Sequence, residues 1–249
     1  MRIIIELSNN NPQTTLKIPL NYNEIITGIV YTTLKDKQYA TKLHDHKGFK
    51  YFTISRIYMY NYRCKPEKNE FIIYDNKIKF QVSSPDNTFI NQLMQGLLEK
   101  ETLRLGHYKV KCTEIKIEEE PTLSTKTEYE TLSPILVRTQ EIRDNKLKTI
   151  DLNPSQPQFY KQLAENITRK YNQYHNKEIY TPENINIYSN MRKVKGVRIA
   201  LKSRNGITMY NRAYMMDINV EAPIPLQKFL YDTGLGERTA MGFGFIKIK

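Results

Sequence analysis

The sequence predicts an α+β protein built from tandem ferredoxin-like (RRM-like) domains with a C-terminal glycine-rich loop. Three observations predict this fold. Strand-like and helix-like segments follow the order β-α-β-β-α-β over residues 1–117. The second half repeats that order, although the sequence itself shows no repeat. Hydrophobic residues make up 39% of the 249 residues, which is enough for a core, and the length fits one or two domains.

The first half contains six predicted elements. Apolar residues that alternate or form short runs predict strands, and apolar residues spaced by three or four predict helices. In chain order these elements are a strand at 2–7, a helix at 22–35, strands at 49–60 and 70–82, a helix opened by Ser84-Pro85-Asp86, and a strand at 107–117.

The second half follows an acidic, threonine-rich stretch at 118–130. We expect this stretch to be a connector or a hairpin between two domains, 1–120 and 121–249. The predicted elements are a strand at 132–139, a helix at 159–174, strands at 196–202 and 207–220, a short helix from Pro223 to Gly234, and a final strand at 243–248.

The charge of the chain indicates its kind of partner. Lysine and arginine outnumber aspartate and glutamate by 38 to 26, which favours nucleic acid or an acidic membrane surface. The membrane is disfavoured, because no apolar run can span a bilayer and no basic amphipathic helix stands out. Cys64 and Cys112 lack zinc-site spacing, so we expect reduced thiols in a cytoplasmic protein, with a disulfide left open. The N-terminus turns polar too soon for a signal peptide.

A cluster of glycines lies close to the C-terminus. Four of the ten glycines of the chain are Gly234, Gly236, Gly242 and Gly244. Glycine permits positive φ and close approach to the backbone, and successive N–H groups can bind phosphate. A strained turn between a helix and a strand needs the same residues, so both interpretations stay open. The segment is no Walker loop, because no Gly-Lys-Ser/Thr follows.

A second segment, residues 191–212, contains seven basic residues and no acidic ones. Its mixture of apolar and basic side chains predicts a strand or hairpin with one cationic face. Phosphate contacts from such a face would give a salt-dependent affinity for nucleic acid. A solvated edge strand guarded by lysines is the alternative, which the lack of acidic neighbours weakens. The basic residues are Arg192, Lys193, Lys195, Arg198, Lys202, Arg204 and Arg212.

A third segment, residues 31–50, contains candidate catalytic groups. Histidine suits proton transfer near neutral pH, and Tyr31 is predicted to point away from the apolar face of its helix. An exposed polar loop would look the same, and a metal site at His44-Asp-His46 lacks a third strong ligand. No acidic cluster indicates two-metal nuclease chemistry, so a catalyst here would use His, Tyr and Lys. RNA permits this, because its 2′-OH can act as the nucleophile while the protein supplies a base, an acid and a cation.

The chain resembles the CRISPR-associated repeat-processing endoribonucleases, the Cas6 family of the RAMP superfamily. Its glycine-rich end matches the C-terminal motif of that family, a glycine pair followed by Gly-hydrophobic-Gly before the last strand. Thr131-Leu-Ser-Pro-Ile135 matches a sequence common at the start of the second half. Residues 43–53 resemble the segment that holds the catalytic histidine in that family. The matching residues are Leu43-His44, Lys47-Gly48, Lys50 and Phe52-Thr53.

This resemblance implies metal-independent cleavage of CRISPR repeat RNA (pre-crRNA) without a cofactor. The products would be crRNA with 2′,3′-cyclic phosphate and 5′-OH ends, and RNA would bind in a cleft between the two domains. His44 matches the catalytic histidine, Tyr31 the partner base, and Lys50 the lysine that stabilises the phosphate. His46 departs from the simple pattern, so either histidine could act, with His44 preferred for its spacing to Lys50.

The RNA contacts implied by the resemblance come from two segments. The basic residues at 192–204, which we call the basic block, would position the RNA, and the backbone of the glycine-rich loop would contact its phosphates. Arg238 and Lys47 would add further contacts.

Two alternatives belong to other functional classes. One is a non-catalytic CRISPR repeat RNA-binding protein with the same fold, and the other is a structural subunit of a ribonucleoprotein effector complex. A common RRM is less consistent, because no stretch matches its aromatic RNP motif. Association with other CRISPR effector subunits and a homodimer are both compatible with the sequence.

Overall fold

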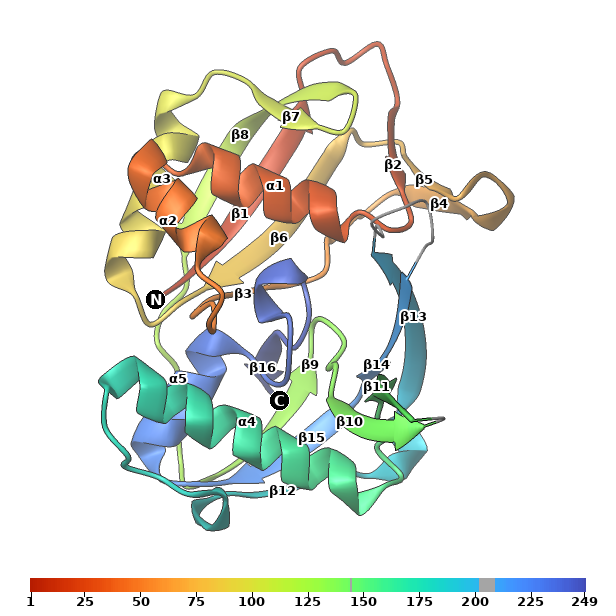
Figure 1. Cartoon of the computed structure of the whole chain (residues 1–249). Helices are drawn as coiled ribbons and strands as arrows, with labels where there is room; N and C mark the ends of the chain where they lie inside the picture. Colours follow the sequence, from red (N-terminus) through yellow and green to blue (C-terminus); the bar gives the residue numbers. More distant parts are fainter. Residues whose placement is uncertain (144, 202–208) are drawn as a thin grey trace.

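The computed structural model describes residues 1–143, 145–201 and 209–249. Each half of the chain contains an antiparallel sheet with helices against it, and the two halves are stacked in Figure 1. Within this described part, no helix is long and apolar enough to cross a membrane. The thiols of Cys64 and Cys112 are free, as expected.

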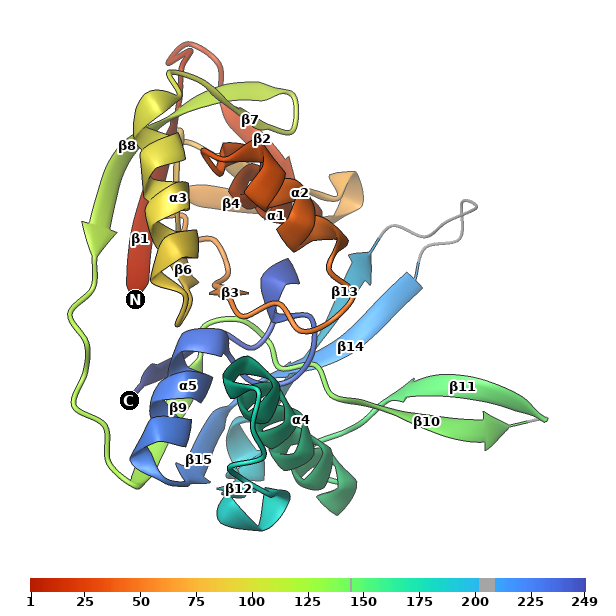
Figure 2. The same cartoon turned by 60° about the vertical axis from the view of Figure 1, so that its left-hand side comes forward.

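The N-terminal half has the ferredoxin-like strand order. Its sheet runs β3-β6-β1-β8-β7, so the first strand lies between strands that come later in the chain. Helices α1 and α3 connect the strands that are not neighbours, and they lie on the same face of the sheet (Figure 2). The elements are β1 (Arg2–Asn9), α1 (Asn23–Thr33), α2 (Lys37–Asp45), β3 (Thr53–Ile54), β6 (Lys77–Ser83), α3 (Asn87–Glu99), β7 (Leu103–Leu105) and β8 (Tyr108–Ile117).

The predicted strands at 49–60 and 70–82 are only partly formed. In the first, just β3 and an isolated bridge from Tyr58 to Lys79 join the sheet. The second is divided, because Asn76 adopts a positive φ of 55° in a turn, a conformation that asparagine tolerates well. The part before this turn belongs to a separate sheet, ordered β2-β5-β4, whose strands are β2 (Leu16–Pro19), β4 (Tyr62–Lys65) and β5 (Glu70–Ile73).

The C-terminal half repeats the same topology. Its main sheet runs β12-β15-β9-β16, so the first strand again lies between later ones, and α4 and α5 make the connections. The predicted helix at 159–174 and the predicted short helix from Pro223 to Gly234 are confirmed. The elements are β9 (Lys126–Thr131), α4 (Pro157–His175), β12 (Asn186–Tyr188), β15 (Asp217–Glu221), α5 (Ile224–Thr233) and β16 (Ile246–Ile248).

The first strand of this half lies earlier than predicted. It is β9, inside the stretch expected to be a connector or a hairpin, while most of the predicted strand at 132–139 is a buried irregular segment. In that segment the Pro134 carbonyl accepts a bond from Gly244 N, and Ser133 Oγ accepts one from Phe245 N (2.9 and 2.8 Å). The segment therefore packs against the glycine-rich loop. The proposed division at residue 120 stays a prediction.

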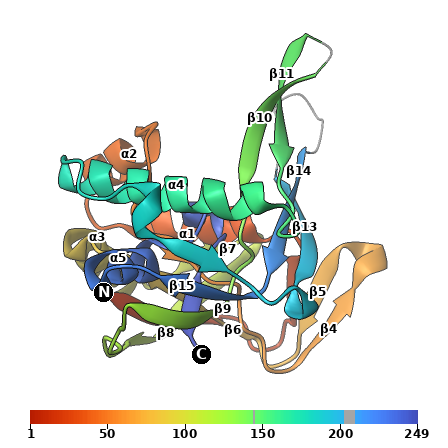
Figure 3. The same cartoon turned by 90° about the horizontal axis from the view of Figure 1, so that it is seen from below.

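Two hairpins are inserted into the C-terminal half and project from it (Figures 2 and 3). One is formed by β10 (Arg138–Arg143) and β11 (Lys146–Asp151) and was not predicted. The other is formed by β13 (Lys195–Leu201) and β14 (Met209–Met215), as the basic block predicted. The predicted strand at 207–220 is interrupted at Met216, where the chain passes from β14 into β15.

Arg2 docks the two halves. Its guanidinium is buried and donates to the carbonyls of Ile246 (2.9 Å) and Tyr231 (2.7 Å). It also lies over the rings of Tyr231 and Phe245, 3.7 and 4.2 Å from their centroids. A buried guanidinium needs such partners, and these contacts join β1 to the C-terminal half.

Candidate active site

A cavity of about 960 Å³ lies where the two halves meet. We call it the main cavity. Helix α1 and the end of α2 line it from the N-terminal half, and α4 and the glycine-rich loop line it from the C-terminal half. Its lining residues include the predicted site residues Tyr31, His44, Lys47, Lys50, Gly236 and Arg238.

Helix α2 presents His44. The sequence pattern predicts no helix here, because the segment is mostly polar; in the structure only Ala40 is fully buried. Asp36 begins the helix, since its carboxylate accepts from the N–H groups of Gln38 and Tyr39 (2.8 and 3.1 Å). His44 therefore occupies the last turn of a helix rather than a loop.

The rings of Tyr31 and His44 are in contact. Their centroids are 5.4 Å apart, and the rings meet edge to face. Tyr31 also packs edge to face on buried Phe52 at 5.8 Å, and burial raises the pKa of its phenol to about 12. His44 Nδ1 lies 3.1 Å from Asp45 Oδ1, which leaves Nε2 for another partner. The two side chains form a phenol–imidazole pair on the wall of the main cavity.

His46 lies elsewhere. It ends α2, and its N–H donates to the Lys42 carbonyl at 3.1 Å. Its side chain lines a neighbouring groove with Tyr51 and Asn172 and does not line the main cavity. The structure thus brings His44, but not His46, to the cavity that Tyr31 lines.

Lys50 holds the end of α2. Its Nζ donates to the carbonyls of Leu43, His44 (2.9 Å) and His46 (2.5 Å). A cation at this position satisfies the last carbonyls of the helix and complements its dipole. Burial lowers the pKa of the Lys50 ammonium. In this geometry Lys50 positions the turn that carries His44, and its charge is directed to backbone oxygens.

The glycine-rich loop brings protein backbones close together. Gly234, Gly236, Gly242 and Gly244 all have φ between 68° and 79°. A Cβ at Gly244 would overlap the Leu235 carbonyl oxygen, and one at Gly236 would lie 2.5 Å from the Leu136 carbonyl oxygen. The N–H groups of Leu235 and Glu237 donate to the carbonyls of Gly244 and Leu136. The glycines therefore allow the strained turn between a helix and a strand that the sequence left open as one interpretation. Contact of the loop with phosphate stays a prediction.

Arginines surround the loop. The Arg138 guanidinium forms an ion pair with Glu237, with Nε 2.9 Å from Oε2, and the Arg138 N–H donates to Oε1 at 3.0 Å. Arg238 and Arg169 line the main cavity. Burial lowers the pKa of the Arg238 guanidinium, and the charge of Arg138 lowers it further by a smaller amount. A positive charge held under these conditions favours a bound anion.

Helix α4 contributes residues that sequence reasoning missed. Gln162, Asn166, Arg169 and Gln173 recur at the helical period and form a polar stripe that faces the cavities. Lys170 is fully buried, with Nζ 3.5 and 3.4 Å from the carbonyl oxygens of Thr233 and Gly234. The sequence contains one sign that Lys170 is unusual, because this lysine lies within the apolar face of the predicted helix at 159–174.

The basic hairpin lies apart from the main cavity. Lys195 and Arg198 are exposed on β13, and Arg192 and Lys193 are exposed just before it. Arg198 stacks on Tyr210, 3.9 Å from the ring centroid, and Lys193 pairs with Asp217 at 2.9 Å. Lys202 and Arg204 lie outside the described residues. A cationic hairpin is therefore present, and its contact with RNA stays a prediction.

Two sequence profiles of one family match the chain. The profile "CRISPR-associated protein Cas6, N-terminal" matches residues 17–116, and "CRISPR associated protein Cas6, C-terminal" matches residues 117–248. A Methanocaldococcus jannaschii protein named CRISPR-associated endoribonuclease Cas6 1 is 31% identical over 248 residues, which cover 99% of this chain and 92% of that protein.

Solved structures have the same fold. One, of a CRISPR associated protein Cas6, has a TM-score of 0.81 at 30% identity and covers 100% of this chain and 99% of that chain. Another, described as an RAMP protein binding different RNA substrates, has a TM-score of 0.84 at 24% identity, over 100% of this chain and 99% of that chain. The chain therefore belongs to the Cas6 family of CRISPR-associated proteins.

Proposed function

We propose that this protein is a metal-independent endoribonuclease that cuts within CRISPR repeat RNA to produce crRNA. The observation that carries the proposal is the contact between Tyr31 and His44 on the wall of a cavity lined by both halves of the chain. The Methanocaldococcus jannaschii relative, which is named an endoribonuclease, supports this activity. The related RAMP protein that binds RNA supports the substrate class.

The reaction needs one base and one acid. The 2′-oxygen attacks the adjacent phosphorus and loses its proton, while the bond to the 5′-oxygen breaks and that oxygen gains a proton. The products carry a 2′,3′-cyclic phosphate and a 5′-OH. Because the pKa of Tyr31 is raised to about 12, its phenol is protonated at neutral pH and suits the donor role better than the base role that the resemblance implied. His44 then accepts the proton of the 2′-OH.

The transition state also needs positive charge. Lys50 directs its ammonium to three backbone carbonyls, so we assign it to positioning His44 rather than to the phosphate. Lys47, Arg169 and Arg238 also line the main cavity and carry the charge that the phosphate requires. The basic hairpin, with Arg192, Lys195 and Arg198, holds RNA beyond the cavity.

Paired histidine variants test the proposal. We expect His44→Ala to reduce single-turnover cleavage of repeat RNA by about 10²-fold or more while the dissociation constant stays within about twofold. His46→Ala is the matched control, because His46 lines the neighbouring groove. Loss of cleavage in His46→Ala with an unchanged rate in His44→Ala would move the chemistry to His46. Tight binding without cleavage by the unaltered protein would indicate a non-catalytic RNA-binding protein or complex subunit instead.

A further inference from the structure

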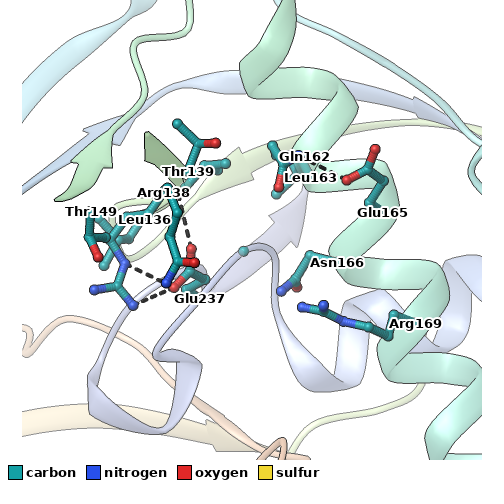
Figure 4. Close-up of a pocket in the computed structure, with 13 residues that line it drawn as sticks. Leu136, Arg138, Thr139, Thr149, Gln162, Leu163, Glu165, Asn166, Arg169 and Glu237 are labelled. Atoms are coloured by element: carbon teal, nitrogen blue, oxygen red, sulfur yellow. Dashed lines mark hydrogen bonds and ion pairs between the residues drawn. The ribbon is translucent and has the colours of Figure 1, made fainter. Parts of the chain in front are cut away.

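A second cavity, of about 560 Å³, adjoins the main cavity. We call it the side cavity. It lies between α4 and the β10–β11 hairpin (Figure 4), and none of the predicted catalytic residues lines it. The two cavities share part of their walls, namely Arg138, Asn166, Arg169, Gly236 and Glu237. A ligand in the side cavity would therefore contact residues that also line the main cavity.

Asn166 has an unsatisfied polar atom in this shared wall. Its side chain is 8% exposed, and no donor among the described residues reaches Oδ1. In Figure 4 Asn166 and Arg169 extend from α4 toward Glu237 and the hairpin. A buried amide oxygen without a donor is unfavourable, so its position indicates a partner that is absent from the free protein.

The charges around the cavity favour an uncharged ligand. Arg138 is paired with Glu237, and Glu165 accepts a hydrogen bond from Gln162 at 2.9 Å. The lining contains two arginines and two glutamates, so its formal charges sum to zero, unlike the main cavity, where Lys47 and Arg238 add positive charge. Leu136 and Leu163 supply apolar surface. A small planar polar group fits this lining better than a phosphate does, and the volume lies within the range of small-ligand pockets.

We propose that the side cavity binds one unpaired base of the RNA, next to the cut, and that the Asn166 amide reads its edge. The proposal rests on the proposed function. An amide offers one donor and one acceptor side by side, which complements adenine or cytosine, whose exocyclic amino group neighbours a ring acceptor. The amino group would donate to the Asn166 oxygen that now lacks a donor. Recognition of splayed-out bases in this way is general in binding to single-stranded RNA.

Base-analogue binding tests the proposal. In protein silenced by His44→Ala, each adenine or cytosine near the cut is replaced in turn by the analogue without its amino group. We expect one position to lose about 10-fold in affinity. Addition of Asn166→Ala should abolish the loss at that position and leave the others unchanged. Gln158→Ala, which removes an exposed amide from the same helix, should keep the whole profile.

A second variant avoids any change in α4. Thr149→Trp places a large ring at an exposed position of β11 that lines only the side cavity, and it should abolish the same discrimination. An Asn166→Ala profile identical to that of its parent, or a parent profile with no sensitive position, overturns the inference. Failure of the parent to bind repeat RNA at all instead overturns the proposed function.

Discussion

Replacement of Lys170 by methionine is predicted to change how stability depends on pH. Lys170 is fully buried at the junction of α4 with the glycine-rich loop, 3.5 and 3.4 Å from two carbonyl oxygens. This burial lowers the pKa of its ammonium from 10.5 to about 7. Methionine has a similar length and no charge, so it removes the titrating group and keeps most of the packing.

The sign of the effect follows from the lowered pKa. In the unfolded chain Lys170 keeps its ordinary pKa of 10.5, so between about pH 7 and 10.5 the unfolded state binds more protons. Burial of the charged form therefore costs most below about pH 7, and the cost declines as the pH rises. A pKa difference of one corresponds to about 1.36 kcal/mol. The free-energy cost of burying Lys170 is then about 5 kcal/mol at pH 6 and about 2 kcal/mol at pH 9.

Urea unfolding at pH 6 and pH 9 measures this effect. Between these pH values the unaltered protein should gain about 3 kcal/mol more stability than Lys170→Met does. Differences in packing between lysine and methionine act at both pH values alike and cancel. Lys161→Met, at an exposed position of α4, is the control and should follow the unaltered protein. Parallel pH dependences for Lys170→Met and the unaltered protein would refute the reasoning.

Three further predictions concern the loop, the hairpin and Lys50. Gly244→Ala should lower the free energy of unfolding by about 3 kcal/mol, because φ is 68° and a Cβ would overlap the Leu235 carbonyl oxygen. Gly28→Ala in α1 is the control: a Cβ there meets open space, so the substitution should stabilise the helix by about 1 kcal/mol. Replacing Arg192, Lys193 and Lys195 together by alanine should weaken RNA binding and flatten its salt dependence by about 0.7 for each phosphate that is no longer neutralised, and an unchanged slope would place the RNA elsewhere. Lys50→Met should speed hydrogen exchange at the end of α2 in the RNA-free protein and slow cleavage with it; unchanged exchange would mean that Lys50 does not hold this turn.

The parts of the fold with a regular apolar pattern were predictable. In α1, Ile26, Ile29 and Val30 recur at helical spacing and are all buried, and β1 buries Ile3, Ile5 and Leu7. These apolar residues follow the period of their elements, so local pattern and tertiary burial agree for them. The repeated β-α-β-β-α-β order followed from them, and the observed sheet orders confirm it.

The structure differs from the sequence-based prediction where contacts between distant segments determine the local conformation. Helix α2 fully buries only Ala40, with Tyr39 and Leu43 partly buried beside it, so its apolar face is short, and the Asp36 cap and Lys50 stabilise its ends. The segment at 132–137 looks like a strand because it is apolar, but its backbone bonds to the glycine-rich loop instead of extending a predicted strand. No local pattern records a partner that lies about a hundred residues away.

The residues of the candidate site also fall into two groups, those that the sequence could indicate and those that it could not. Tyr31 and His44 could be proposed from residue type and spacing, and the structure brings their rings together. Asn166 could not, because it is a polar residue within a helix and its importance depends on what the loop and the hairpin place beside it. Lys170 has only one signal in the sequence, its position within the apolar face of the predicted helix at 159–174.

Cleavage of CRISPR repeat RNA in EDTA tests the central claim most directly, with a matched RNA that carries one 2′-deoxy nucleotide at the cut. We expect cleavage of the all-ribose RNA to continue in EDTA and to leave a 2′,3′-cyclic phosphate. The deoxy RNA should be bound but stay intact, because it lacks the attacking oxygen. Cleavage that stops in EDTA, or that continues on the deoxy RNA, would contradict the assignment of the chemistry to the 2′-OH, Tyr31 and His44.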